Sequence, residues 1–181
     1  MNLRVELLRE HSARQTEMLT DYACLRRSHF EELLDVFFRG TPREKQLAAD
    51  VLAMASTQRA AWLLPHLEAL LAAAQHTTGH HPAVRRAVAK ALQFISVPEE
   101  WQALAFDTCL AMLASPTEPV AIRTYALSAA SRLAFPYPEL AAEVLAAAER
   151  ALTTTDSPAI RSRAARELPK LRKKVREGLP G

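Results

Sequence analysis

The fold is decided by three short stretches, Pro82-Ala83-Val84-Arg85, Val120-Ala121-Ile122-Arg123 and Pro158-Ala159-Ile160-Arg161. Each places a branched residue before an arginine, and consecutive arginines are separated by an identical spacing of 38 residues. Small or apolar residues recur 3, 4, 7 and 10 positions after each arginine, which is the spacing of one face of an α-helix. The sequence therefore predicts a repeated unit with an amphipathic helix that begins near each arginine.

Between these copies lies a second set of amphipathic segments, headed by Tyr22, Trp62, Trp101 and Leu140 at spacings of 40, 39 and 39 residues. A weaker copy of the arginine-led helix begins at Pro42. We therefore expect four hairpins of a first helix (helix A) and a second helix (helix B), over about residues 22–55, 59–96, 99–134 and 138–173. One N-terminal helix over about residues 2–19 precedes them, and a basic tail over 174–181 follows.

Local signals mark where these helices begin and bend. Thr41-Pro42-Arg43-Glu44 combines an N-cap threonine, a proline at the first helical position and a glutamate that closes a capping box. Ser157-Pro158 repeats the same type of start. Pro65 falls within a helix A and Pro169 within the last helix B, and a proline in either place is expected to kink or delay the helix.

A hairpin of roughly 40 residues in which Pro-x-Val/Ile-Arg opens helix B resembles the HEAT repeats. The resemblance covers about residues 22–172. It implies one all-α domain over 1–181, a right-handed α-α superhelix whose B helices line its concave face. It also implies that the arginine is structural and bonds to an acid in the turn before it. Asp156 matches that position before Arg161 and Glu118 before Arg123, whereas His80 stands there before Arg85.

Composition excludes several classes of protein. The chain is 49% hydrophobic and 24% charged, which is typical of a folded protein and not of a disordered one. Cys24 and Cys109 lie in apolar helical stretches, so two buried thiols are expected and not a disulfide. The N-terminus lacks the apolar core of a signal peptide, and no apolar run reaches the roughly 18 residues of a membrane helix. We therefore predict a cytoplasmic protein without a membrane partner.

The candidate catalytic and metal-binding residues are few. His76, His80 and His81 surround a glycine, and their spacing suits a polar surface loop better than a metal site. Cys109 lacks a base placed by the sequence and is assigned to the core. Trp62 and Trp101 occupy equivalent repeat positions and are interpreted as packing residues, not as base-stacking platforms. The sequence predicts no catalytic residue, no metal and no cofactor.

Positive charge is concentrated at the C-terminus. Residues 158–181 carry eight Lys or Arg against two Glu, a net charge of +6, although the whole chain has only +3. This run acts either as the solvated face of a terminal repeat or as a phosphate-binding stripe. Basic residues on the polar side of the earlier B helices extend this run. The whole candidate binding surface consists of Arg86, Lys90, Arg132, Arg166, Lys170, Lys173 and Lys174.

We expect a non-catalytic module that binds another protein through helix B. The alternative is a protein that binds nucleic acid through the basic C-terminal helix. In outline the chain is also similar to HEAT-like DNA glycosylases, which need an acid and aromatic residues on the concave face. Asp50 is the only acid among the polar helix-B positions that we assign to the concave face. A HEAT-like bilin lyase or its subunit is a further reading that no residue supports, and the sequence does not specify an oligomeric state.

Overall fold

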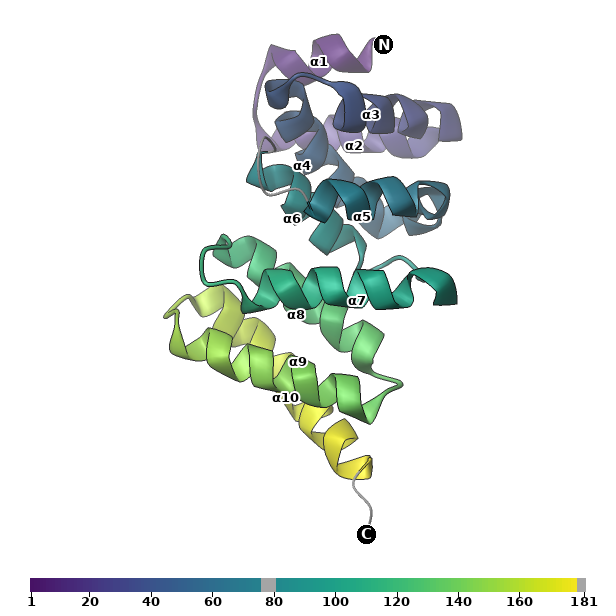
Figure 1. Cartoon of the computed structure of the whole chain (residues 1–181). Coiled ribbons are helices and arrows are strands. Elements are labelled where there is room, and N and C mark those ends of the chain that lie inside the picture. The colour runs from purple at the N-terminus through teal and green to yellow at the C-terminus, as the bar shows by residue number, and fades with distance from the viewer. Residues whose placement is uncertain (76–80, 179–181) are drawn as a thin grey trace. The chain divides into compact units, whose positions relative to one another are not determined.

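The computed structural model describes residues 1–75 and 81–178, and every regular element in that part of the chain is helical (Figure 1). The all-α prediction is confirmed. The chain divides into two compact units, Met1–Val97 and Pro98–Gly181, which we call unit 1 and unit 2. Unit 1 holds α1 (Leu3–Arg9), α2 (Ala13–Leu25), α3 (Arg27–Arg39), α4 (Pro42–Arg59), the 3-10 helix η1 (Ala60–His66), α5 (Leu67–Gln75) and α6 (Pro82–Ala91). Unit 2 holds α7 (Glu99–Ala114), α8 (Val120–Ala134), α9 (Pro138–Thr153) and α10 (Pro158–Glu177).

The N-terminal segment of unit 1 contains two helices where the sequence predicted one. The prediction of a single helix over 2–19 was wrong, because the backbone is extended at Glu10 and a new helix begins after Ser12. The Ser12 hydroxyl accepts a hydrogen bond from the backbone N–H of Gln15 at 3.1 Å and so caps α2. Since α2 continues to Leu25, Tyr22 lies inside it and does not head the next helix. The helices α1 and α2 form an additional pair, and α2 packs beside α4.

The predicted capping box at the start of α4 is confirmed. The backbone N–H of Thr41 donates to Glu44 Oε2 at 2.7 Å, and the Glu44 N–H donates to the Thr41 hydroxyl at 3.4 Å. The carboxylate of Glu44 is buried, and its other oxygen lies 3.6 Å from Arg4 Nε. The hydrogen bond from the Thr41 backbone, followed by the one involving its side chain, lowers the pKa of Glu44, and Arg4 adds to this effect.

The two internal prolines act differently. Pro65 lies in η1, so the chain follows a 3-10 helix before α5 begins, as expected of a proline in that position. At Pro169 the helix is not interrupted, because α10 runs as one helix from Pro158 to Glu177. Leu168 and Leu171 on either side are buried, and α10 packs on both α8 and α9, which offsets the one hydrogen bond that proline removes. The helix extends to Glu177, so residues 174–177 of the predicted tail are helical.

Unit 2 consists of two layers of helices. α7 packs beside α9 and α8 beside α10, while α7–α8 and α9–α10 are the two hairpins. We call α7 and α9 the A layer of this unit and α8 and α10 its B layer. Fully buried alanines such as Ala126 and Ala130 on α8 and Ala147 on α9 lie between them. Small side chains let helix axes approach closely, which explains the alanine-rich composition.

The repeated arginines have structural partners. Arg85 Nη1 donates to the carbonyl of Ala74 at 2.6 Å, and Arg123 Nε donates to that of Leu113 at 3.2 Å. Both carbonyls belong to the last turn of a helix A, where the backbone has no helical partner. Arg161 instead pairs with Asp156, as the family resemblance implied. These contacts support the structural role that the sequence analysis gave to the arginines.

In the described part of the chain, no helix is both long enough and apolar enough to cross a lipid bilayer.

Candidate functional site

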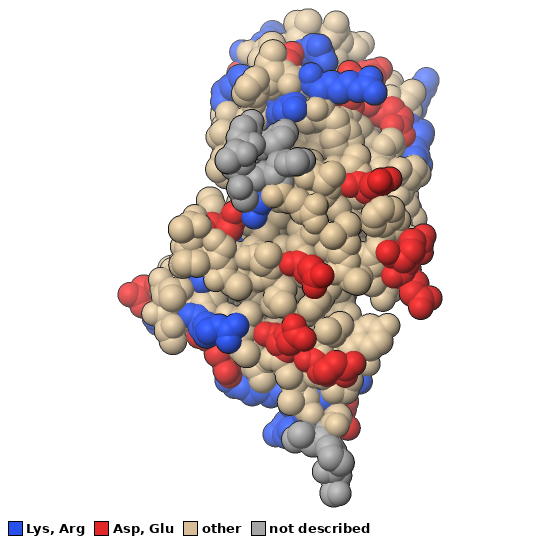
Figure 2. Space-filling view, in the orientation of Figure 1, with Lys and Arg blue, Asp and Glu red and all other residues tan. Residues whose placement is uncertain are grey.

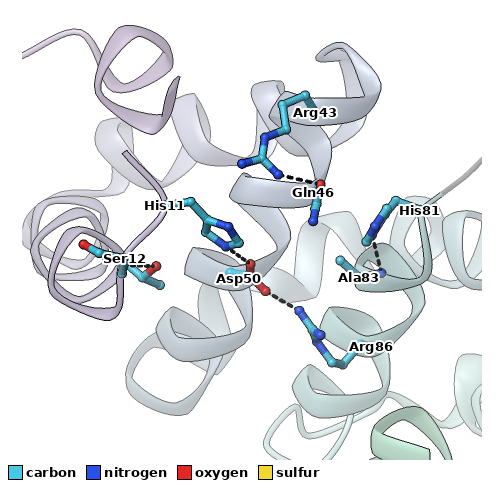
Figure 3. Close-up of polar contacts among 9 residues, drawn as sticks. His11, Ser12, Arg43, Gln46, Asp50, His81, Ala83 and Arg86 are labelled. Carbon is cyan, nitrogen blue, oxygen red and sulfur yellow. Dashed lines mark hydrogen bonds and ion pairs between the residues drawn. The ribbon is translucent and has the colours of Figure 1, made fainter. Parts of the chain in front are cut away.

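Arg86 and Lys90, the two unit 1 members of the candidate binding surface, lie on α6 and face α4. Arg86 Nη2 donates to Asp50 Oδ1, and the other carboxylate oxygen of Asp50 lies 3.3 Å from His11 Nε2 (Figure 3). Arg86 therefore has a matched counter-charge within unit 1. Lys90 is half-buried, and this burial, together with the nearby charge of Arg86, lowers the pKa of its ammonium group. Arg86 is thus paired within unit 1, and burial disfavours the charged form of Lys90.

The other five predicted cations lie in the B layer of unit 2. Arg132 is in the last turn of α8, and Arg166, Lys170 and Lys173 follow one another on α10 at spacings of 4 and 3 residues. Such spacings place side chains on one face of a helix. Lys170 and Lys173 are 61% and 75% exposed. We call this exposed side of α8 and α10 the α8–α10 face.

A hollow of about 330 Å³ opens on the α8–α10 face. Phe135, one residue past the end of α8, is among its lining residues and is 55% exposed. The ammonium of Lys174 lies 5.8 Å from the centre of the Phe135 ring, within cation–π range. The lining residues of the hollow are Ser128, Ser131, Arg132, Phe135, Glu167, Lys170 and Leu171.

The polar side chains of the hollow form a connected network. The Ser128 hydroxyl accepts a hydrogen bond from Arg163 Nη1 and donates to Glu167 Oε1 at 3.5 Å. Lys170 Nζ donates to Glu167 Oε2 at 3.2 Å. Glu167 is thus held between α8 and α10 with both oxygens occupied. Its single charge is offset by Lys170, and Arg166 on the same helix has no ion pair among the described residues. The face therefore keeps a surplus of positive charge.

Cys109 and Trp62, which the sequence raised as candidates for catalysis and base stacking, are enclosed by neighbouring side chains. Burial raises the pKa of the Cys109 thiol to about 12, so the thiol stays protonated at neutral pH and is a poor nucleophile. Trp62 packs edge-on against Phe30 with ring centroids 5.4 Å apart, and the guanidinium of Arg59 lies 5.1 Å from its ring. These neighbours occupy the ring that a stacked base would need.

The histidine cluster is only partly described. His81 Nδ1 accepts a hydrogen bond from the Ala83 N–H at 3.1 Å and caps α6, while His76 and His80 lie outside the described residues. Within the described ranges, no group of three or more His, Cys, Asp or Glu side chains is arranged to hold a metal ion.

The structure adds residues to the site that sequence reasoning missed. Ser128 and Glu167 connect the two helices, and Phe135 supplies the apolar part of the hollow. Ser128 follows Arg123 by five positions, as Lys90 follows Arg85 and Arg166 follows Arg161, so its equivalence to these cations could be read from the sequence. Phe135, however, follows the last periodic position of α8, and only the packed helices show it beside Leu171.

Comparison with known proteins supports the repeat interpretation. The family described as HEAT repeat domain matches residues 3–171, which is most of the chain. No significant match was found among curated proteins or among solved structures. The match extends to the N-terminal pair α1 and α2, which the sequence comparison had left outside the repeats. The chain belongs to the HEAT repeat domain family.

Proposed function

We propose that this protein is a non-catalytic protein-binding module, and that the α8–α10 face of unit 2 holds an acidic segment of a partner protein. The observation that carries the proposal is the exposed Phe135 ring beside a hollow bordered by Arg132 and Lys170. Aromatic side chains and arginine are the residues most often responsible for binding energy in protein interfaces. Family membership supports an interaction role in general.

The charge pattern indicates the kind of partner. α8 carries two arginines and no acid, a net charge of +2, and α10 carries eight Lys or Arg against two Glu, a net charge of +6. A partner with Asp or Glu residues would complement this face, and an apolar side chain of that partner would lie against Phe135 and Leu171. The helix-B location predicted from the sequence is retained, but it is narrowed to unit 2.

Nucleic acid is the second candidate, because Arg166, Lys170 and Lys173 form a continuous basic stripe on α10. One observation favours protein over nucleic acid. Phe135 is the one aromatic residue lining the hollow, whereas single-stranded nucleic acid is usually bound by several stacking residues.

The glycosylase and bilin lyase alternatives receive no support from the geometry. Asp50, the acid that a glycosylase would use, is bound by Arg86 and paired with His11. We therefore propose no enzymatic activity for the chain.

Two fluorescent probes test the proposal: a glutamate-rich peptide with phenylalanine or leucine at every fourth position, and a random-sequence DNA duplex. We expect the protein to bind the peptide more tightly than the duplex. Phe135→Ala should weaken peptide binding by about 2 kcal/mol, roughly 30-fold, because it removes the apolar anchor. Phe94→Ala is the matched control, since Phe94 is an exposed phenylalanine of unit 1.

Two other outcomes would contradict the proposal. Duplex binding that weakens steeply with salt, and that Phe135→Ala leaves unchanged while Lys170→Glu abolishes it, would favour nucleic acid. Failure of the wild-type protein to bind the peptide at low salt would refute the proposed chemistry of the partner.

A further inference from the structure

The A layer of unit 2 contains a second hollow, of about 390 Å³, which the proposed function does not use. It lies along α7 and α9, and four large apolar side chains line it: Phe106 from α7, Leu133 from the end of α8, Tyr137 from the turn before α9, and Leu140 from the first turn of α9. The Tyr137 side chain is 42% exposed. The hollow therefore offers apolar and aromatic surface to a ligand.

Carboxylates surround this apolar surface. Glu99 and Asp107 line it from α7, and Glu139 and Glu143 line it from α9, and none of the lining residues is Lys or Arg. Figure 2, which views unit 2 from the side of α7 and α9, shows acidic side chains gathered over these two helices. Together α7 and α9 carry six Asp or Glu against one Arg, a net charge of −5.

These four carboxylates differ from the acids of unit 2 that pair with a cation. Glu149 pairs with Arg172 at 2.9 Å, and Glu167 pairs with Lys170 at 3.2 Å. No ion pair involves Glu99, Asp107, Glu139 or Glu143 within residues 1–75 and 81–178. The helix dipole accounts for Glu99 and Glu139, which lie in first turns. It does not account for Asp107 and Glu143, which lie farther along their helices.

We propose that the α7–α9 hollow is a second docking surface, which binds a basic amphipathic segment of a partner protein. Charge complementarity selects this occupant: its Lys or Arg side chains would meet the four unpaired carboxylates, and its apolar face would cover Phe106 and Leu140. The exposed ring of Tyr137 would also accept a guanidinium or ammonium group over its face. This surface lies in the layer opposite to the α8–α10 face, so its occupancy does not depend on the proposed function above.

The proposal gives unit 2 two surfaces of opposite sign. Such a unit would hold a basic partner on its A layer and an acidic partner on its B layer at the same time. The same arrangement would also let the basic α10 of one copy meet the acidic α7–α9 hollow of another, so the test has to separate a foreign segment from a second copy.

The experiment measures binding of a fluorescein-labelled lysine/leucine amphipathic peptide to the full-length protein by anisotropy. A glutamate/leucine peptide of the same length is the control probe. The test variant is Asp107→Asn with Glu143→Gln, which removes two charges without changing side-chain size. Glu100→Gln is the matched control variant, because Glu100 is an exposed acid of α7 that does not line the hollow. Circular dichroism and thermal unfolding verify that each variant is folded.

We expect the double variant to weaken lysine/leucine binding by about tenfold, and Glu100→Gln to change it by no more than about twofold. Tyr137→Ala should also weaken it, which distinguishes a seated segment from general attraction to negative charge. Lys170→Glu should leave it unchanged, so that failure of this proposal and failure of the proposed function give different results.

Unchanged binding in both the double variant and Tyr137→Ala would overturn the proposal. Sedimentation of the protein without peptide provides the other decisive outcome. Self-association that is lost equally in the double variant and in Lys170→Glu would identify a second copy as the occupant, and would refute a foreign basic segment.

Discussion

The α4–α6 surface of unit 1 and the α8–α10 face of unit 2 are built from equivalent repeat positions, yet they differ in whether the first helix supplies an acid to the cations of the second. In unit 1, Asp50 on α4 binds Arg86 on α6 and pairs with His11. In unit 2, the position equivalent to Asp50 is Ser128, which has no charge to offer the cations of α10. Asp50 thus gives the unit 1 surface an ion pair between α4 and α6 that Ser128 cannot make between α8 and α10.

Whether a cation on a B helix can bind a ligand depends on the acids around it. The acids that matter lie on the same helix, as Glu167 does for Lys170, or on the preceding repeat, as Asp50 does for Arg86. Sequence position alone assigned Arg86 and Lys170 to the same surface. Their contacts separate them, because Arg86 is held by the half-buried Asp50 of another helix, whereas Lys170 pairs with Glu167 of its own helix and remains 61% exposed.

The largest effect is expected on the free energy of unfolding when the buried Arg123 of unit 2 is replaced. Arg123 is 3% exposed and donates to Leu113 and to the Thr154 hydroxyl at 3.1 Å. Arg123→Ala should lower the free energy of unfolding by about 2–4 kcal/mol, because the carbonyl of Leu113 loses a charged donor in a buried site. Arg161→Ala, at the equivalent but exposed position, should cost no more than about 1 kcal/mol. Urea unfolding measures both, and equal costs would contradict the structural assignment.

A transplant of the unit 1 acid tests the comparison directly. Ser128→Asp puts a carboxylate next to Arg163 and in the row that Asp50 occupies in unit 1. It should weaken binding of the glutamate-rich peptide by about tenfold, because the surplus charge of the face is reduced. Ser128→Asn is the uncharged control of similar size. If both variants bind equally, the effect is steric and the charge comparison is wrong.

The reverse change opens the unit 1 surface. Asp50→Asn leaves Arg86 without its ion pair, so the free energy of unfolding should fall by about 1 kcal/mol, as expected for a pair that is only partly buried. The same variant should elute later from heparin, since unit 1 gains an unmatched cation. Arg86→Gln in the Asp50→Asn background should restore early elution. Unchanged elution of the single variant would show that Asp50 does not neutralise Arg86.

The smallest effect concerns a matched charge at the start of α4. The folded-state pKa of Glu44 lies below its usual value of 4.5, so its contribution to stability is complete above that pH and is lost as the pH falls through the lowered pKa. Glu44→Gln should therefore cost about 1 kcal/mol at neutral pH and progressively less in acid. Urea unfolding at several pH values measures the difference. A difference that does not vary with pH would exclude the carboxylate as its source.

Much of the fold could be predicted because it depends on short-range patterns. The third hairpin was predicted over about residues 99–134, and α7 and α8 together occupy that range. The capping box at Thr41 and Glu44 follows from four consecutive residues. The break between α1 and α2 was missed although four consecutive polar residues, Arg9 to Ser12, interrupt the apolar pattern there. The local signal was present in Ser12, whose hydroxyl caps α2.

The candidate site was harder to predict because its contacts join residues in different repeats. Asp50 and Arg86 are 36 positions apart, and Ser128 and Glu167 are 39 apart. The repeat alignment identifies which rows are neighbours, but side-chain reach decides which members of two rows meet. The α7–α9 hollow was missed for the same reason, since its acids come from two helices and its Tyr137 from a turn.

Chemical-shift mapping of the isotope-labelled protein with the glutamate-rich peptide tests the central claim most directly. The account predicts that the largest shifts occur on the α8–α10 face, at Ser128, Phe135 and Lys170, with little change at Arg86 and Lys90. Shifts concentrated at Arg86 and Lys90 would contradict it, because they would show that the internally paired surface of unit 1 is the one that binds.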